Sequence, residues 1–413
     1  MKVLVSNCRY FVSGGPERYM FSLKELLENN GHKFIPFSVA YTRNKNSAYQ
    51  KYFIRPPGDP SIIYFSELNL SMLDKLKFAL NAIYSLEAKT KLRRLIEDIE
   101  PDIMHTLQIH TFMSYSVIDA AKEHGLPIVS RMSNYQLMCP SELFFRKQGV
   151  CEECKKTLFN AVRYKCIQKS TAGSAIRVAS LIFHRMKRTF SKIDRFIVPS
   201  RFLADKMIDY GFPADKISHV PSFINTEDFT PEFTSDGYIV YSGRIAEEKG
   251  IQFLIEAYVR ARIKPELYII GEATDEEGAR IQKYVQERNI SKVRILGYQP
   301  LPKLKEIIKK SLFTICPSKW YENTPMSTYE SFALGKPVLG ANLGSIPEQI
   351  IDGRTGLLFE PNNIEDLAEK LNYLADHPKL VIEMGREARR IVETHHSPEI
   401  HYNHLMKIYE QLI

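Results

Sequence analysis

The chain has 413 residues, of which 44% are apolar and 25% are charged. These are ordinary values for a globular protein, and they exclude collagen-like, disordered and disulfide-scaffold classes. At about 150 residues per domain, the length predicts two or three domains. No run approaches the roughly 18 apolar residues of a membrane-spanning helix, and the N-terminus lacks the apolar segment of a signal peptide. We therefore expect a soluble, cytoplasmic protein.

The net charge of +8 is unevenly distributed. Residues 1–220 carry 33 Lys and Arg against 20 Asp and Glu, whereas residues 221–413 carry 23 against 28. Within the first half, residues 151–200 hold 11 basic and 3 acidic residues. A basic patch favours an anionic partner, such as a phosphate-bearing acceptor or an anionic membrane surface, although a solvated face would have the same composition.

Short β-rich runs alternate with longer helical patterns through the first half. The predicted strands cover 2–6, 33–39, 102–105, 127–132 and 195–200, and the predicted helices begin after Gly14-Gly15 and lie near 72–98 and near 112–124. Two insertions interrupt the pattern, near 41–70 and 135–175. We expect the extra length of the chain to lie in these insertions rather than in a third core.

The same alternation is clearer in the second half. The predicted strands cover 238–242, 266–271, 293–296, 313–316, 337–340 and 356–359, and the helices begin near 249 and 364 or lie near 275–288, 301–310 and 325–334. Strands separated by single helices run parallel, because each crossover returns the chain to the same edge. Each half therefore predicts a doubly wound, Rossmann-like α/β domain, with ligands bound at the carboxyl ends of the strands.

A polar stretch bounded by Pro221 and Pro231 separates the two patterned halves and is the candidate linker. The predicted N-terminal domain covers 1–220 and the predicted C-terminal domain covers 221–396. A break at Ser397-Pro398 precedes a last helix, which we expect to return to the first domain over 397–413. The two sheets would then face each other across a central cleft.

The strongest motif lies in residues 320–361, where Glu322 and Glu330 are separated by seven residues. Glu322 lies in a predicted loop after a strand, and Glu330 lies in the helix that begins near Pro325. A helix N-terminus offers unpaired amides and a positive dipole end, which suit an anionic or hydroxyl-rich ligand. Because Pro has no N–H, the donors would come from Met326, Ser327 and Thr324. An isolated pair of glutamates at this spacing is more often a solvated helix face.

Further motifs accompany this pair in a fixed order. They are GGPER at 14–18, PDIMH at 101–105, SGRIAEEKG at 242–250, the GKPV turn, the GxxPE turn at 344–348 and the DGxTG turn at 352–356. With them the chain resembles family 4 of the retaining, nucleotide-sugar-dependent glycosyltransferases of the GT-B fold, over almost its whole length. The resemblance is to enzymes of the capsule and lipopolysaccharide type.

The resemblance implies transfer of a sugar from a UDP- or GDP-sugar to a hydroxyl of a glycan or lipid-linked acceptor. The N-terminal domain would bind the acceptor and the C-terminal domain the donor. Arg244 and Lys249 match the cations that grip the donor diphosphate, and two cations at a strand end and a helix start can offset two phosphate charges. No catalytic metal is then required. Taken alone, such a pair is more often two solvated surface cations.

Other residues also match family positions. The resemblance implies that Glu322 orients the hydroxyls of the transferred sugar, with the backbone of Asn323, Thr324, Met326 and Ser327 beside it. It also implies that Glu330 accepts hydrogen bonds from the ribose hydroxyls. Gly14 and Gly15 match a loop that faces the phosphate and sugar, although two glycines can also be a plain turn. Gly297 and Tyr298 match the nucleobase position, with an ordinary core or surface Tyr as an equal alternative.

One departure concerns the loop after the strand at 127–132. Related sequences carry a His-Asn or His-Asp pair there, whereas this chain has Ser133 and Asn134. Ser cannot carry the charge of an imidazole. Either His105 or His110 supplies the missing contact to the sugar or acceptor, or the substrates differ from the common type, or the activity is lower.

Four cysteines lie in the second insertion. Cys139, Cys151, Cys154 and Cys166 have 11, 2 and 11 residues between successive members. A CxxC with two flanking cysteines is typical of a structural zinc site, which would hold an insertion that has no obvious core of its own. Free, buried thiols are an equal alternative.

The helical pattern over 177–195 combines an apolar face with basic residues. The face comprises Val178, Leu181, Ile182, Met186, Phe190 and Ile193, and Arg185, Lys187, Arg188 and Lys192 lie elsewhere. A core-packing helix explains this pattern, and contact of the basic side with anionic lipid is the rival.

Other functions remain open at this point. A GT-B nucleotide-sugar epimerase or phosphorylase would share the phosphate-gripping residues, and Ser133 is compatible with a catalytically silent sugar-nucleotide binder. Residues 151–200 contain no helix-turn-helix, zinc-finger or RNP pattern, so we expect no nucleic-acid partner.

Overall fold

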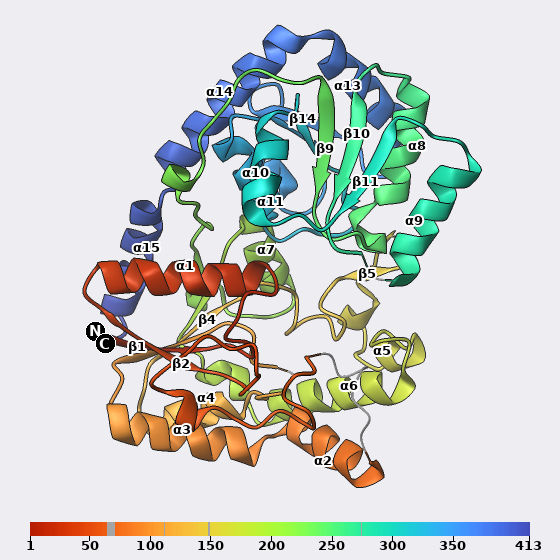
Figure 1. Ribbon diagram of the computed structural model, residues 1–413. Coiled ribbons are helices and arrows are strands. Elements are labelled where there is room, and N and C mark those ends of the chain that lie inside the picture. The colour runs from red at the N-terminus through yellow and green to blue at the C-terminus, as the bar shows by residue number, and fades with distance from the viewer. Residues whose placement is uncertain (64–70, 111, 148, 274) are drawn as a thin grey trace.

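The computed structural model describes residues 1–63, 71–110, 112–147, 149–273 and 275–413. It consists of two α/β units, one above the other in Figure 1, each built on a six-stranded parallel sheet. Two Rossmann-like, doubly wound domains facing each other were the prediction, and the GT-B architecture is confirmed. Among the described residues, no helix is both long enough and apolar enough to cross a bilayer.

The first sheet has the order β2-β1-β3-β4-β7-β8. Its strands are β1 Lys2–Ser6, β2 Lys33–Phe37, β3 Ile103–Thr106, β4 Ile128–Arg131, β7 Arg195–Val198 and β8 Ile217–His219. Alternate residues of β1 enter different cores: Val3 and Val5 face a cluster that includes α1, whereas Leu4 faces a larger cluster on the other side. The sequence pattern predicted all of these strands except β8, a three-residue edge strand with partly exposed side chains.

Helices cover both faces of the first sheet (Figure 1). Helix α1 (Gly15–Asn29) and the last helix α15 (Pro398–Glu410) lie on one face. The opposite face carries α2 (Met72–Ile83), α3 (Leu86–Ile99), α4 (Ser116–Glu123) and α6 (Thr171–Met186), and α7 (Arg201–Asp209) follows β7. The predicted helix over 72–98 is therefore two helices, because Tyr84 is extended and the Ser85 hydroxyl caps α3 by accepting from the Ala88 amide.

The insertion near 135–175 packs onto the core of the first unit. It contains the hairpin β5 (Phe145–Arg146) and β6 (Gly149–Val150) and the short helix α5 (Asn160–Arg163). Tyr135, Leu137, Met138 and Phe144 are fully buried in the same cluster as the sheet. The expectation that this insertion lacks a core is therefore wrong. Of the predicted insertion near 41–70, residues 64–70 lie outside the described residues, as does residue 148 of this one.

The second sheet has the order β11-β10-β9-β12-β13-β14. Its strands are β9 Tyr238–Ser242, β10 Glu266–Ile270, β11 Val293–Gly297, β12 Thr314–Cys316, β13 Val338–Ala341 and β14 Gly356–Phe359. Its helices are α8 (Ile251–Ala261), α9 (Asp275–Glu287), α10 (Leu301–Lys309), α11 (Met326–Ala333), α12 (Ile346–Gln349), α13 (Ile364–Asp376) and α14 (Pro378–His395). Helix α8 packs with α13, and α11 packs with α14.

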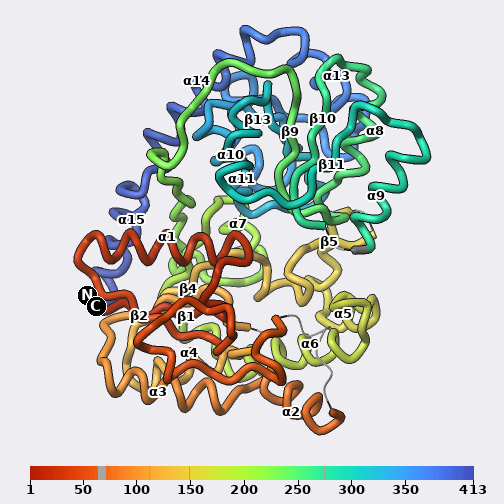
Figure 2. The backbone as a smooth tube through the Cα atoms, in the orientation of Figure 1, coloured from red at the N-terminus to blue at the C-terminus, as the bar shows by residue number. Residues whose placement is uncertain are grey.

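The chain crosses between the two units twice. Figure 2 shows the segment after β8 and the segment between α14 and α15 running side by side. The Ile224 amide donates to the His396 carbonyl at 2.9 Å, which ties the two crossings together. The predicted boundary at residue 220 falls between β8 of the first sheet and β9 of the second. In α15, Leu405 and Tyr409 are fully buried in the core of the first unit.

Candidate active site

Lys249 and Glu322 form a buried ion pair at the carboxyl edge of the second sheet. Lys249 lies between β9 and α8, and Glu322 follows β12, and these two strands are neighbours in the sheet. The Lys249 Nζ atom lies 2.6 Å from Glu322 Oε1, which also accepts a hydrogen bond of 2.5 Å from the Ser318 hydroxyl. The ammonium lies 5.0 Å from the centre of the Trp320 ring. Two of the predicted catalytic residues are thus in direct contact.

The pKa of Glu322 is below its ordinary value. Burial alone would raise this pKa, because it removes water from the carboxylate. The charge of Lys249 and the hydrogen bonds from Lys249 and Ser318 outweigh burial and lower it. Glu322 is therefore an anion at neutral pH, next to the Lys249 amine at the carboxyl ends of the strands.

Two glycines allow the loops around this pair to touch. Gly250 has φ of +71°, and a Cβ there would lie 2.3 Å from the Pro317 carbonyl oxygen. Gly344 has φ of +63°, and a Cβ there would lie 2.8 Å from the Glu322 amide nitrogen. Side chains other than Gly would be both strained and obstructed at these positions. The SGRIAEEKG and GxxPE motifs thus fix the backbone on either side of Glu322.

Arg244, the third predicted catalytic residue, lies in the loop after β9. Its Nη2 atom lies 2.8 Å from Glu248 Oε1, and its side chain is 60% exposed. Unlike Lys249, Arg244 is itself largely exposed, although its partner Glu248 is buried. An exposed guanidinium with one carboxylate neighbour can turn to a phosphate, which it would bind through two parallel hydrogen bonds.

Glu330 is paired with a residue of the opposite unit. Arg18, in the first turn after Gly14-Gly15, places Nη1 3.0 Å from Glu330 Oε1. Helix α1 therefore begins beneath α11, as Figure 1 shows. Burial raises the pKa of Glu330, and Arg18 offsets only part of that effect. In the sequence Arg18 is the last residue of the GGPER motif, and nothing in that motif indicates its partner.

The loop after Glu322 also reaches the first unit. The Asn323 side chain donates to the Met132 carbonyl at 3.0 Å and accepts from the Ser200 hydroxyl at 3.1 Å. The Thr324 hydroxyl lies 3.4 Å from the Pro199 carbonyl oxygen. The side chain of Asn323 is therefore engaged between the units, and only its backbone remains for the predicted donor contact.

The GxxPE glutamate makes a similar bridge. Glu348 accepts hydrogen bonds from the amides of Arg201 and Phe202, at 2.8 and 2.6 Å. These amides belong to the first turn of α7, where a carboxylate also complements the helix dipole. The second unit thus caps a helix of the first.

Gly14 and Gly15, two of the three glycines predicted to bind the donor, lie where α1 begins, after the first strand of the first sheet. Neither has a φ in the left-handed region, and a Cβ on Gly15 would meet nothing within 4 Å. A Cβ on Gly14 would meet only ordinary contacts, 3.6 Å from the Glu17 carboxylate. The protein's own packing therefore does not require glycine here. Open space beside Gly15 is consistent with a loop that leaves room for a ligand.

Gly297 and Tyr298 border a hollow of about 410 Å³ at the carboxyl ends of β10 and β11. Ile245, directly after Arg244, and Gly271 line the same hollow. Tyr298 is exposed at its rim. The predicted nucleobase position thus lies in a surface hollow, and the residue after Arg244 lines the same hollow.

Of the predicted sugar or acceptor contacts, His110 and Asn134 come together. Both bind Glu142: His110 Nε2 lies 2.5 Å from Oε1, and the Asn134 amide donates to Oε2 at 2.6 Å. Ser133, which replaces the family His, is next to Asn134 and half-buried. Glu142 was missed in the sequence, because nothing about its position marked it as a partner of these two residues.

His105 is placed differently. It is fully buried, and Nδ1 lies 2.5 Å from the Tyr409 hydroxyl of α15. Burial lowers its pKa to about 3, and the charge of Arg131 adds to this effect. The side chain therefore belongs to the core between β3 and α15, and its predicted contact with a sugar or acceptor gains no support from this position.

Cys139, Cys151, Cys154 and Cys166 are all free thiols in the insertion. Burial raises the pKa of Cys154 to about 12, and the three other cysteines lie close enough to add to it. Among the described residues, however, no group of three or more His, Cys, Asp or Glu is arranged to hold a metal ion. The thiols share one neighbourhood without a ligand geometry, and structural zinc stays a prediction.

Comparison with known proteins identifies the family. Residues 224–391 match the family Glycosyl transferases group 1, and residues 165–228 match Glycosyltransferase Family 4. These matches support a glycosyltransferase of the family 4 type. They confirm the resemblance that the motifs indicated, and the first match includes the Lys249–Glu322 pair.

Relatives and solved structures agree with this family. The chain is 27% identical over 211 residues to D-inositol 3-phosphate glycosyltransferase of Paenarthrobacter aurescens, which covers 46% of this chain and 51% of that protein. The chain thus spans about half the length of this relative. Sucrose-phosphate synthase from Thermosynechococcus elongatus has the same fold, with a TM-score of 0.74 at 18% identity over 100% of this chain and 98% of that chain. Anabaena HepE, solved in complex with UDP-glucose, has a TM-score of 0.69 at 13% identity, over 99% of this chain and 100% of that chain.

Proposed function

We propose that this glycosyltransferase transfers a sugar, with retention of configuration, from a nucleotide diphosphate to an acceptor hydroxyl. The observation that carries the proposal is the Lys249–Glu322 pair, which places a buried anion and a cation at the carboxyl ends of β9 and β12. The exposed Arg244 and the N-terminus of α11 lie in the adjoining loops. This set suits a ligand that carries both phosphates and hydroxyls.

Each part of a nucleotide sugar has a counterpart in the site. The nucleobase would occupy the hollow beside Gly297 and Tyr298, and Glu330 would accept from the ribose hydroxyls. Arg244 and Lys249 would hold the diphosphate, with the bare Gly14-Gly15 turn opposite. Glu322 and the amides of Met326 and Ser327 would orient the transferred sugar. That Anabaena HepE was solved with UDP-glucose supports a UDP-sugar as the donor.

The proposed chemistry needs charge stabilisation above all. The leaving diphosphate gains negative charge as the glycosidic bond breaks, and fixed cations lower a barrier most where charge develops. We propose that Arg244 and Lys249 supply these charges and that the reaction requires no divalent ion. The acceptor, a glycan or a lipid-linked sugar, would enter from the first unit past His110, Ser133 and Asn134.

A screen of UDP- and GDP-sugars for thermal stabilisation tests the proposal. A donor at one hundred times its Kd should add about 2.7 kcal/mol to the free energy of unfolding. Product analysis with a labelled donor then separates a transferase, which needs a second molecule, from an epimerase or a silent binder. Absence of stabilisation by every UDP- and GDP-sugar would contradict the proposal. Activity that survives a chelator would support the metal-free reaction.

A further inference from the structure

Helix α2 carries an apolar stripe that no part of the described chain covers. The exposed fractions are 85% for Met72, 79% for Leu73, 59% for Leu76 and 60% for Leu80. Four large apolar side chains on a single surface helix are unusual, because exposed hydrophobic residues normally occur singly. The stripe therefore indicates a surface that binds another molecule.

The four side chains share one side of the helix. At about 100° per residue, they fall within an arc of about 100°. Phe78 and Ala82 lie on the other side and face the protein: the Phe78 ring packs 5.7 Å from that of Phe112, and Ala82 is buried. The apolar arc is thus turned outward. Met72 and Leu73 begin the helix, but Leu76 and Leu80 are exposed within it.

Lysines flank the stripe on both edges. On the same helical projection, exposed Lys75 and Lys77 fall about 60° and about 40° beyond its two margins. Asp74, the one acidic residue of α2, projects to the opposite side. An apolar arc bordered by lysines is the composition of a helix that lies in a membrane interface, where the alkyl stems reach past the apolar zone to the headgroups.

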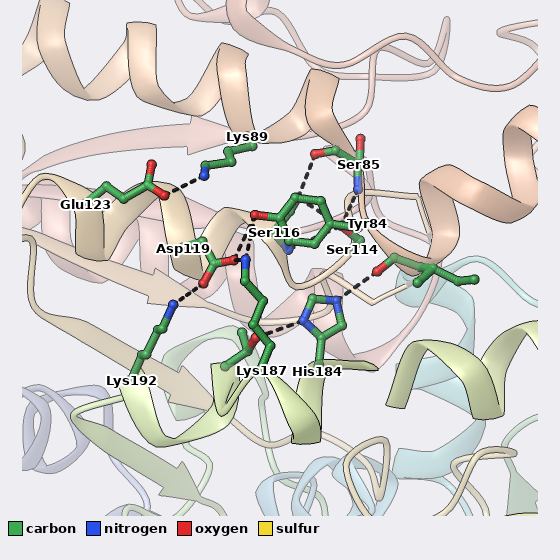
Figure 3. A network of polar contacts seen from close by, with 12 residues as sticks. Tyr84, Ser85, Lys89, Ser114, Ser116, Asp119, Glu123, His184, Lys187 and Lys192 are labelled. Atoms are coloured by element: carbon green, nitrogen blue, oxygen red, sulfur yellow. Dashed lines mark hydrogen bonds and ion pairs between the residues drawn. The ribbon is translucent and has the colours of Figure 1, made fainter. Parts of the chain in front are cut away.

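Polar contacts at the end of α2 hold it in this orientation, and Figure 3 shows those made by His184 and by Tyr84, the residue after the helix. Ser180 and His184 of α6 bind the carbonyls of Ala82 and Ile83, at 3.1 and 2.8 Å. The next residue, Tyr84, donates to buried Asp119 at 2.8 Å. Buried polar contacts therefore fix the last turn of α2, so the helix that carries the stripe is held rigidly against the first unit.

The same network involves part of the rival surface that the sequence indicated. The helix expected over 177–195 ends at Met186, which is exposed and does not join its apolar face. Lys187 and Lys192 both pair with Asp119, and Arg185 donates to the Leu137 carbonyl, although Arg185, Lys187 and Arg188 stay exposed. Three of the four basic residues expected on that side are thus engaged by the protein itself, whereas Lys75 and Lys77 border the apolar stripe of α2.

Helix α2 is also connected to the edge where the acceptor would enter. A hollow of about 370 Å³ lies between α2 and residues 54–58, and Lys77, Lys91 and Phe112 are among its lining residues. From Phe112 a row of rings leads through Tyr41 to Phe11, three residues before Gly14, with centroid separations of 6.3 and 6.0 Å. The stripe, the hollow and the Gly14-Gly15 turn thus follow one another along the first unit.

We propose that α2 seats the protein on an anionic lipid bilayer, so that a lipid-linked acceptor enters the first unit from the membrane side. The choice of acceptor class rests on the proposed function, whereas the docking itself does not. Charge favours lipid over a second copy of this chain. A two-fold contact through α2 would bring Lys75 and Lys77 close to their own counterparts, and the first 220 residues carry a surplus of 13 positive charges from 33 basic and 20 acidic residues.

Co-sedimentation of the full chain with vesicles tests the proposal. We expect binding to vesicles of phosphatidylcholine mixed with phosphatidylglycerol and little binding to pure phosphatidylcholine. Leu76→Ser with Leu80→Ser should weaken binding about tenfold or more, because buried apolar area sets interfacial affinity. Lys75→Gln with Lys77→Gln should weaken binding to the anionic vesicles by about fivefold for each lysine.

The control is Val259→Ser, which removes an exposed apolar side chain from α8 of the second unit. It should bind vesicles like the unchanged chain. Because the substituted side chains are exposed, all variants should keep the thermal unfolding temperature and the stabilisation by donor nucleotide. This separates failure of docking from failure of the proposed function. Vesicle binding that is absent, or equal in the Leu76/Leu80 variant, overturns the proposal. Self-association that this variant abolishes, without vesicle binding, assigns the stripe to a second copy.

Discussion

Arg18 of the first unit and Glu330 of the second are joined by an ion pair of 3.0 Å. The first unit therefore holds, through Oε1, the carboxylate that is proposed to bind the donor ribose. Arg18 follows Gly14-Gly15 by one helical turn. One motif thus supplies both the bare turn and the residue that orients Glu330.

Replacing Arg18 by Gln should weaken donor binding modestly. The Arg18 side chain is 46% exposed, and such ion pairs contribute about 0–1 kcal/mol, which corresponds to fivefold or less in Kd. Titration with UDP and with 2′-deoxy-UDP measures the effect. Only the ribonucleotide should lose affinity, and Arg18→Lys should recover part of it. Equal losses for both nucleotides would mean that Arg18 acts on the phosphates and not through Glu330.

Replacing Glu330 by Gln should stabilise the free protein and weaken the donor complex. Burial raises the pKa of Glu330, so the fold favours the protonated carboxyl. The charged form therefore costs stability above the ordinary pKa, and this cost disappears as the pH falls through the raised pKa. A neutral amide removes the cost, but it loses charged hydrogen bonds of about 1.5–3 kcal/mol to the ribose.

Calorimetry and donor titration check this trade-off. The unfolding temperature of Glu330→Gln should be higher than that of the unchanged protein at pH 7, and the difference should shrink in acid. A lower unfolding temperature at pH 7 would show that the pair with Arg18 outweighs the burial of the carboxylate.

Arg244→Ala and Lys249→Ala should both lower kcat by about two orders of magnitude, as expected when a charge-stabilising group is lost. They should differ in stability. Arg244 is largely exposed, whereas Lys249 is the buried partner of Glu322. Removing one member of a buried pair leaves an uncompensated charge and costs about 3 kcal/mol. In Lys249→Ala a loss of stability is therefore mixed with the loss of charge stabilisation, whereas Arg244→Ala tests charge stabilisation alone.

A compensated variant separates the two effects of Lys249. Lys249→Met with Glu322→Gln removes both charges, so it should unfold at a higher temperature than Lys249→Ala while staying inactive. Recovery of turnover together with stability would mean that Lys249 is only structural. The pKa of Glu322 is lowered, so the stability that the pair contributes should be lost as the pH falls below the ordinary glutamate value.

Two glycine substitutions should behave oppositely. Gly15→Ala meets open space at an ordinary φ, so it should leave the unfolding temperature unchanged or slightly raised. It should nevertheless weaken donor binding, because its Cβ would occupy the space of the phosphate. Gly344→Ala is strained and obstructed by Glu322, so it should lower the unfolding temperature by itself. Unchanged donor affinity in Gly15→Ala would remove this turn from the proposed site.

The zinc prediction has a direct measurement. Protein purified without added zinc should contain about one equivalent per chain if the four thiols hold the metal, and a chelator should then lower the unfolding temperature. Much less than one equivalent would reject the prediction and leave Cys139, Cys151, Cys154 and Cys166 as free thiols of the core.

The strands could be predicted because their signal is local. The runs at 238–242 and 356–359 became β9 and β14 with the same bounds, since buried parallel strands read as continuous apolar segments. Helix α2 is the opposite case. Its Leu73, Leu76 and Leu80 look like a core face in the sequence, yet they lie at the surface. Periodicity shows that a helix has an apolar face, but it does not show whether that face packs into the core or lies at the surface.

Lys249 and Glu322 could be named from the sequence because each stands in a motif of the second half, and the structure brings them into contact. Contacts between the units could not be read, because they join residues far apart in the chain. Arg18–Glu330 and the capping of α7 by Glu348 are such contacts. Glu142, which joins His110 to Asn134, had no motif at all.

The packing of α15 has a consequence for synthesis on the ribosome. The strands of the first unit come from residues 2–219, yet Leu405 and Tyr409 fill its core. The unit that is translated first must therefore wait for the end of the second before its apolar surface on that face is closed. While residues 238–395 are being made, the emerging chain exposes this unfinished face. A nascent chain stalled before residue 398 should accordingly be more sensitive to protease in its first unit than in its second.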